Sequence, residues 1–157
     1  MSSKAAAFAA SLPRTGSLLA LDLSKRRIGL AGTDPERRLV TPLLTFERKG
    51  QAADLSRLRA VVEERSVVAL VAGLPLNMDA SEGPAARSAR DTARNFAQAL
   101  GLPCLMQDER LTTEAVREAI AEGRLARPKP GAAIDHYAAA VILEDALRAL
   151  RAAGPLC

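Results

Sequence analysis

Three acidic residues occupy positions where carboxylates could do chemistry. Asp22 lies in an apolar run and shares an alternation face with Leu18 and Ala20. Glu109 follows a short apolar segment, and Asp135 begins the last helical pattern. A buried carboxylate without a partner costs several kcal/mol of desolvation, so a ligand or a hydrogen-bond donor must offset that cost at Asp22. Because Mg²⁺ and Mn²⁺ prefer carboxylate oxygens, three acids from three separate elements predict a site for such an ion.

Each acid taken alone also has a structural explanation. Asp22 could be satisfied by amides of a hairpin turn, and Asp108 and Glu109 could be solvated charges beside Arg110. Asp135 could be an acid in the first turn of a helix, where the helix dipole favours negative charge. The metal site is therefore a hypothesis about the three acids together.

The chemistry that such a site would perform is phosphodiester hydrolysis. Two divalent cations about 4 Å apart can activate a water and steady the leaving oxygen during in-line attack. Zinc is disfavoured because His136 is the only histidine and neither Cys104 nor Cys157 has a ligand partner at metal-binding spacing.

Basic residues suggest a nucleic-acid partner. The net charge is +4 and the isoelectric point is about 9.6, and cations in clusters suit a phosphate backbone. Aromatic residues make up only 3% of the chain, so stacking of unpaired bases cannot dominate binding. The predicted substrate-binding residues are Lys25, Arg26, Arg27, Asn77 and Arg110. Basic residues also gather at Arg37–Arg38, at Arg87, Arg90 and Arg94, and at Arg124, Arg127 and Lys129.

Hydrophobic periodicity predicts an α/β fold with a mixed sheet. A hairpin and a third short strand would form an antiparallel meander, and strands alternating with helices would follow it, with helices on both faces of the sheet. The expected strands cover 18–23, 28–33, 43–46, 67–72 and 102–107, and the expected helices cover 53–64, 84–100, 113–122 and 134–151.

The length of 157 residues fits one domain, which we place at 18–152. Residues 1–17 have the composition of a flexible extension or of a weak transit peptide. The longest apolar stretch is far shorter than the roughly 20 residues that cross a bilayer, so no membrane association is expected. Two cysteines without a pairing pattern indicate a reducing, cytoplasmic location.

Four segments together resemble one family. They are Leu19–Gly29, Val71–Asp79, Asp108–Ala115 and Ile134–Ala140. In this order they resemble the YqgF/RuvX family of Holliday-junction-resolvase-like proteins, which are implicated in maturation of the 5′ end of pre-16S ribosomal RNA. The resemblance spans about 18–150 and implies a ribonuclease H-like fold, with the metal-binding acids of the family at Asp22, Glu109 and Asp135.

Two positions depart from the pattern of this family. The family usually has Gly-Thr-Lys where this chain has Ser24, Lys25 and Arg26. It often has glycine where this chain has Ala80. A positive φ at position 24 would be strained without glycine, whereas the change at position 80 bears on the flexibility of its loop.

The expected function is metal-dependent cleavage of structured RNA. A Holliday junction resolvase is the alternative enzyme, and it would need a homodimer to present two sites to a branched DNA, whereas an RNA nuclease could be a monomer. A catalytically silent RNA-binding assembly factor and a nucleotide-binding relative of the actin-like fold are further alternatives. The chain has no room for the second lobe that a nucleotide-binding relative would need.

Overall fold

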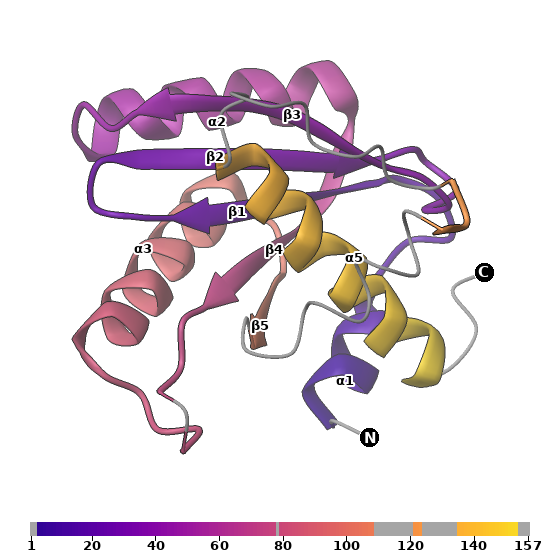
Figure 1. Ribbon diagram of the computed structural model, residues 1–157. Helices are drawn as coiled ribbons and strands as arrows, with labels where there is room; N and C mark the ends of the chain where they lie inside the picture. The colour runs from indigo at the N-terminus through magenta and orange to yellow at the C-terminus, as the bar shows by residue number, and fades with distance from the viewer. Residues whose placement is uncertain (1–2, 78, 109–120, 124–134, 154–157) are drawn as a thin grey trace.

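The computed structural model describes residues 3–77, 79–108, 121–123 and 135–153. It contains one five-stranded sheet in the order β3-β2-β1-β4-β5 (Figure 1). The strands are β1 (Ser17–Leu23), β2 (Arg27–Thr33), β3 (Val40–Glu47), β4 (Val67–Leu74) and β5 (Cys104–Asp108). Strands β1, β2 and β3 form an antiparallel meander, and β4 and β5 continue the sheet in parallel with β1. The predicted mixed sheet is therefore confirmed.

In the described part of the chain, four helices cover the two faces of this sheet. They are α1 (Ser3–Ser11), α2 (Gln51–Arg65), α3 (Pro84–Leu100) and α5 (Asp135–Ala153). Helix α5 runs across one face, and α2 and α3 lie on the other (Figure 1). The helix expected at 113–122 and the basic loop expected at 123–133 lie almost wholly outside the described residues. None of the described helices combines the length and the apolar character needed to span a membrane.

Alternation along β1 divides its side chains between two cores. Leu18 and Ala20 are fully buried beneath α5, in a cluster that contains Leu143. Leu19 and Leu21 are fully buried on the other side, in the cluster formed with α2 and α3. Because successive side chains of a strand point to opposite faces, Asp22 belongs to the α5 face. The regular pairing of β1 with β2 through Asp22 keeps the alternation on which the prediction of this face rests.

The first residues of the chain differ from expectation. Residues 3–11 form helix α1, whereas the sequence suggested a flexible extension over 1–17. Ala5 and Phe8 are buried in the same cluster as residues of α5, and α1 lies beside α5 in Figure 1. A helix of this length is marginal by itself in water, so burial of these two side chains is what stabilises it.

Arg37, one of the two arginines of the Arg37–Arg38 pair, also has a role other than the one expected. Arg37 was counted among surface cations, but only 2% of it is exposed. Its Nε donates to the carbonyl of Gly16 at 2.9 Å and its Nη2 donates to the carbonyl of Pro13 at 2.9 Å. Burial lowers the pKa of this guanidinium. Arg37 therefore holds the segment between α1 and β1 in place and does not contribute to a nucleic-acid surface.

The two departures from the family pattern behave differently. Ser24 keeps a negative φ, and its side chain closes the hairpin turn, because Oγ donates to the Arg27 carbonyl at 2.9 Å and accepts from the Arg27 amide at 3.1 Å. Ala80, in contrast, has a φ of 72°. Glycine is therefore not needed at position 24, and the backbone is strained at position 80.

Replacing Phe8 should reveal whether α1 is part of the folded unit. Phe8→Ala removes a buried aromatic ring and should lower the free energy of unfolding by about 3 kcal/mol. Urea unfolding followed by circular dichroism measures this change. The exposed neighbour provides the control, Ala7→Ser. An unchanged midpoint for Phe8→Ala would mean that residues 3–11 are not packed on α5.

Relief of strain at position 80 is a second expected effect. Ala80→Gly removes the cost of a left-handed conformation, about 1–2 kcal/mol, and adds unfolded-state entropy that offsets about 0.4–1 kcal/mol of this gain. The net stabilisation should be several tenths of a kcal/mol or more, measured by urea unfolding. The exposed Ala85→Gly on α3 should destabilise instead, since glycine weakens a helix.

Candidate metal-dependent active site

Asp22 stands in a row of residues that crosses the sheet on the α5 face. It pairs with Gly29 of β2, and Gly29 pairs with Thr45 of β3. On its other side β4 runs in parallel, and the pairing of Leu21 with Ala72 brings Gly73 next to Asp22. Glycine carries no side chain, so neither strand next to Asp22 places a side chain beside its carboxylate on this face. Asp22 itself is half-buried.

The start of α5 lies over one end of this row. Thr45 Oγ1 and His136 Nδ1 form a hydrogen bond of 2.9 Å, and both residues are partly buried. Adjacent strands are about 4.8 Å apart, so Thr45 is about 10 Å from Asp22 across the sheet. His136 directly follows Asp135, the first residue of α5. The backbone of Asp135 is thereby held near the row that contains Asp22.

The other end of the row reaches β5. Gly73 pairs with Gln107, whose Nε2 donates to Asp145 Oδ2 of α5 at 2.6 Å. Asp108, the last residue of β5, follows Gln107. The two hydrogen bonds, one at each end of the row, fix where α5 crosses the sheet.

The three predicted metal ligands are only partly described. Asp22 is described in full, whereas Glu109 and the side chain of Asp135 lie outside the described residues. Among the residues that the structure does describe, no group of three or more acids, histidines and cysteines is placed to hold a metal ion. The metal site of Asp22, Glu109 and Asp135 thus stays a prediction, and so does the role of Arg110, which also lies outside the described part.

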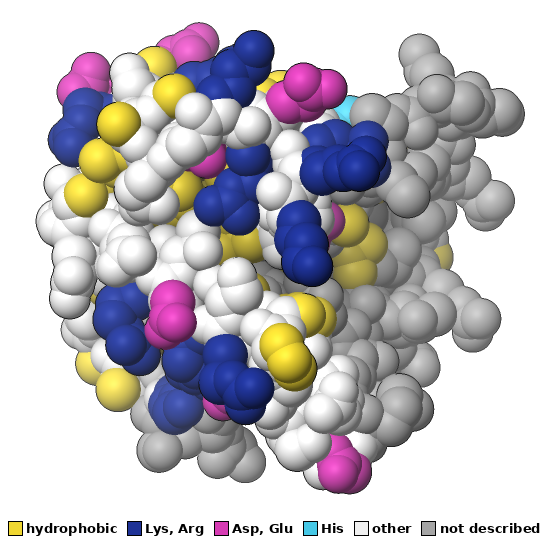
Figure 2. Space-filling view, turned by 90° about the vertical axis from the view of Figure 1, so that its left-hand side faces the viewer, with side chains coloured by type: hydrophobic (Ala, Val, Ile, Leu, Met, Phe, Trp, Pro, Cys, Tyr) yellow, Lys and Arg dark blue, Asp and Glu magenta, His cyan; other side chains and the backbone are white. Residues whose placement is uncertain are grey.

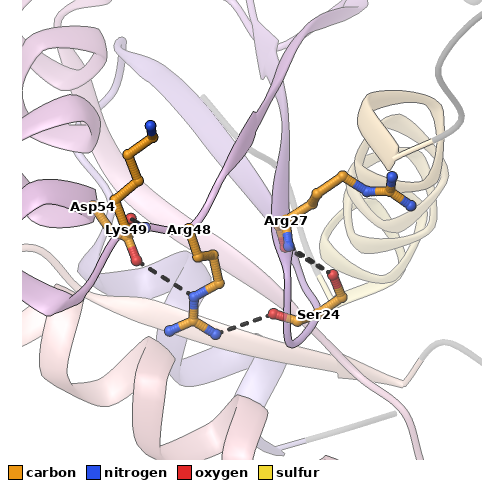
Figure 3. Close-up of polar contacts among 5 residues, drawn as sticks. All are labelled: Ser24, Arg27, Arg48, Lys49 and Asp54. Atoms are coloured by element: carbon orange, nitrogen blue, oxygen red, sulfur yellow. Dashed lines mark hydrogen bonds and ion pairs between the residues drawn. The ribbon is translucent and has the colours of Figure 1, made fainter.

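The basic side chains of the hairpin turn lie on both sides of the sheet. Arg27 has the same alternation as Gly29, and its side chain extends on the side where α5 lies (Figure 3). Lys25 lines a groove that opens on the side of α2 and α3. Lys25, Arg26 and Arg27 are all exposed. Figure 2 faces this end of the molecule and shows several groups of Lys and Arg side chains on it.

Asn77 has hydrogen bonds within its own loop. Its Nδ2 donates to Ser81 Oγ at 3.0 Å, and Ser81 Oγ donates to Asp79 Oδ1 at 2.5 Å. The side chain is exposed beside Gly83, the residue before α3. These bonds show that Asn77 shapes the loop between β4 and α3, and substrate binding by Asn77 stays a prediction.

Asp145 carries the clearest electrostatic perturbation near the row. Burial raises the pKa of its carboxyl above the ordinary value of 3.8, and the Asp108 carboxylate raises it further, although the Gln107 hydrogen bond and Arg148 act in the opposite direction. The structure therefore brings two additional carboxyl groups, Asp108 and Asp145, close to each other beside β5. Sequence analysis missed Asp145 because it lies in an ordinary amphipathic helix.

The raised pKa of Asp145 has a consequence for stability. The folded chain holds this proton more tightly than the unfolded chain, so stability falls as pH rises through the interval between 3.8 and the raised pKa. Asp145→Asn should therefore unfold at higher urea than the unchanged protein at about pH 7, and the difference should shrink towards about pH 4. Glu63→Gln, an exposed change on α2, is the control. A difference that does not depend on pH would contradict the raised pKa.

Known proteins resemble this chain over most of its length. Residues 16–149 match the model of the RuvX family, described as a Holliday junction resolvase. A relative from Cereibacter sphaeroides strain ATCC 17025 is 49% identical over 140 residues, which are 89% of this chain and 88% of that protein. A relative from Rhodopseudomonas palustris strain BisA53 is 48% identical over 139 residues, 88% of this chain and 85% of that protein. Both carry the name "Putative pre-16S rRNA nuclease".

Solved structures show the same fold at much lower identity. RuvC from Thermus thermophilus matches with a TM-score of 0.60 and 15% identity, over 87% of this chain and 97% of RuvC. RuvC in complex with a Holliday junction substrate matches with a TM-score of 0.57, also at 15% identity, over 88% of this chain and 97% of that one. The predicted ribonuclease H-like α/β fold is thus confirmed. Because the matched region extends through most of the chain and the two relatives are about half identical to it, the chain belongs to the RuvX family.

Proposed function

We propose that this protein is a divalent-metal-dependent nuclease that hydrolyses phosphodiester bonds during processing of the 5′ end of pre-16S ribosomal RNA. The observation that carries the proposal is the position of Asp22, between two glycine-bearing strands on the face of the sheet that α5 crosses. Membership of the RuvX family supports the reaction, and the name shared by the two relatives supports the substrate. Processing of this RNA would place the protein in the cytoplasm.

The residues around Asp22 fit a hard divalent cation. A carboxylate offers the oxygen ligands that Mg²⁺ and Mn²⁺ prefer, and glycines on both neighbouring strands add no side chain that would compete with the waters these ions retain. Glu109 comes one residue after β5, and Asp135 is the first residue of α5, and both elements adjoin the row of Asp22. We assign all three acids as ligands of one or two Mg²⁺ or Mn²⁺ ions. When bound, such ions activate a water for attack and neutralise charge that develops on the phosphate.

Cations of this chain would orient the nucleic acid. Arg27 lies on the Asp22 side of the hairpin, where a phosphate near the acids needs a positive neighbour (Figure 3). A guanidinium suits this task because its fork of N–H groups matches two phosphate oxygens. Lys25, Arg26, Arg110 and Asn77 are the other assigned contacts.

A Holliday junction resolvase is the second candidate, because the family description and the DNA-bound RuvC both concern such junctions. That activity requires two active sites, which this chain would supply as a homodimer. Cleavage of precursor RNA requires one site and is compatible with a monomer.

Loss of Asp22 should abolish cleavage while preserving the fold. Asp22→Asn keeps the shape of the side chain but removes the ligand charge. Divalent cations supply several kcal/mol of transition-state stabilisation, and each 1.36 kcal/mol is a factor of ten, so cleavage should fall about 10³-fold. The assay follows pre-16S RNA in Mg²⁺ or Mn²⁺, with the exposed Asp91→Asn on α3 as a charge-matched control.

The same assay separates the candidates. Glu109→Gln and Asp135→Asn should each reduce cleavage as much as Asp22→Asn does. Cleavage that survives all three changes would refute the metal assignment. Cleavage of a four-way DNA junction by a dimer, with precursor RNA left intact, would favour the resolvase. A protein that binds the RNA but never cleaves it would be an assembly factor.

A further inference from the structure

A groove adjoins the end of β1 on the face opposite to Asp22. It has a volume of about 970 Å³ and lies between the β1–β2 turn and the first turns of α2 and α3. Polar lining groups come from Ser24 and Lys25 of the turn, Arg48 before α2, and Ser88 and Thr92 of α3. Cations and hydroxyls from three separate elements are the donors that phosphate oxygens accept.

Arg48 is fixed at the wall of this groove. Its Nη1 donates to the Ser24 carbonyl at 3.1 Å, and its Nε donates to Asp54 Oδ2 at 3.4 Å (Figure 3). These bonds use two of the five N–H groups that a guanidinium carries, and further N–H groups lie in the same plane. Side-chain freedom has thus already been lost in the absence of a ligand, which favours binding of an anion by Arg48.

Among the described residues that line the groove, one is an acid, Asp54, and its carboxylate stabilises the neighbouring loop. Asp54 is only 1% exposed. Its Oδ1 accepts from the Lys49 amide at 2.9 Å, and its Oδ2 accepts from Arg48. The carboxylate therefore holds the loop before α2 and presents little charge to an incoming anion.

Two helix termini add to the positive potential. Gly50 precedes α2 and Pro84 begins α3, and both line the groove. Neither helix has a side-chain hydrogen bond at its N-cap. Their first N–H groups contribute partial positive charge at the rim, beside Lys25 and the ion-paired Arg48.

The position of the groove relates it to the candidate active site. Leu23 and Ser24, which line it, directly follow Asp22 in the chain. Asp22 points to the α5 face, whereas the groove opens on the α2 and α3 face. A nucleic-acid strand that passes over the end of β1 would meet both Asp22 and the groove within a few nucleotides.

We infer that this groove binds phosphates of the nucleic-acid strand that continues beyond the bond being cut. The inference rests on the proposed nuclease function for the identity of the ligand, but it concerns binding and not cleavage. Phosphates are the shared feature of RNA and DNA, so the groove should hold either backbone without reading bases.

A charge placed in the groove tests this inference. Ser88→Glu introduces a carboxylate at an exposed position that lines the groove, and Asn95→Glu introduces the same group at an exposed position two turns further along α3. Binding is measured by fluorescence anisotropy with labelled single-stranded RNA and DNA of one sequence, in chelator so that no cleavage occurs. Ser88→Glu should weaken binding of the RNA and of the DNA about fivefold at roughly 0.1 M salt, because the loss of one phosphate contact reduces the affinity by about that factor. Asn95→Glu should have little effect.

A second pair of variants separates a specific loss of phosphate contacts from an effect of misfolding. Lys25→Gln should reduce the salt dependence of binding by about 0.7 in the slope of log K against log salt, whereas Arg38→Gln at the opposite end of the sheet should leave it unchanged. Equal effects of Ser88→Glu and Asn95→Glu, or an unaltered slope for Lys25→Gln, would overturn the groove assignment. Failure of the nuclease proposal would instead appear as no cleavage by the unchanged protein in Mg²⁺ or Mn²⁺, with these binding results intact.

Discussion

The packing of α5 across one face of the sheet is the constraint on which the candidate site depends. The hydrogen bond between Thr45 and His136 holds the start of this helix over β3, and that between Gln107 and Asp145 holds its middle over β5. Between these two bonds lie fully buried side chains such as Leu143. Apolar burial of this kind supplies most of the stabilisation, about 25 cal/mol per Å², and the hydrogen bonds set the position of the helix along the sheet.

Asp22 gains its surroundings from the same geometry. The registers of β1 with β2 and with β4 place glycines beside it on each neighbouring strand. Larger residues at Gly29 and Gly73 would stand on the α5 face next to the carboxylate, where they would fill space that a cation and its waters require. The small residues in this row are therefore as much a part of the candidate site as the acid.

The sequence alone predicted the helices and strands whose hydrophobic pattern is local. Alternation in β1 and β2 and helical spacing in α2 and α3 predicted these elements, with ends shifted by a few residues. Helix α1 was missed because its Ala-rich sequence has no first-turn acid and no glycine stop, and its stability depends on α5, which is more than 120 residues away in the chain. Arg37 was misjudged for a similar reason, since its carbonyl partners at Pro13 and Gly16 precede it by more than 20 residues.

The candidate site, too, could be predicted from the sequence only in part. Asp22 was recognised as a charge in an apolar strand, but the groove beside it was not, because its donors come from three segments that only the fold brings together. Asp22 and this groove lie on opposite sides of β1, because Asp22 shares the alternation face of Leu18 and Ala20 whereas the groove opens beside α2 and α3. The hairpin turn after β1 serves both sides, since Arg27 extends towards α5 and Lys25 lines the groove. One short turn therefore offers a cation to phosphates on either side of the sheet.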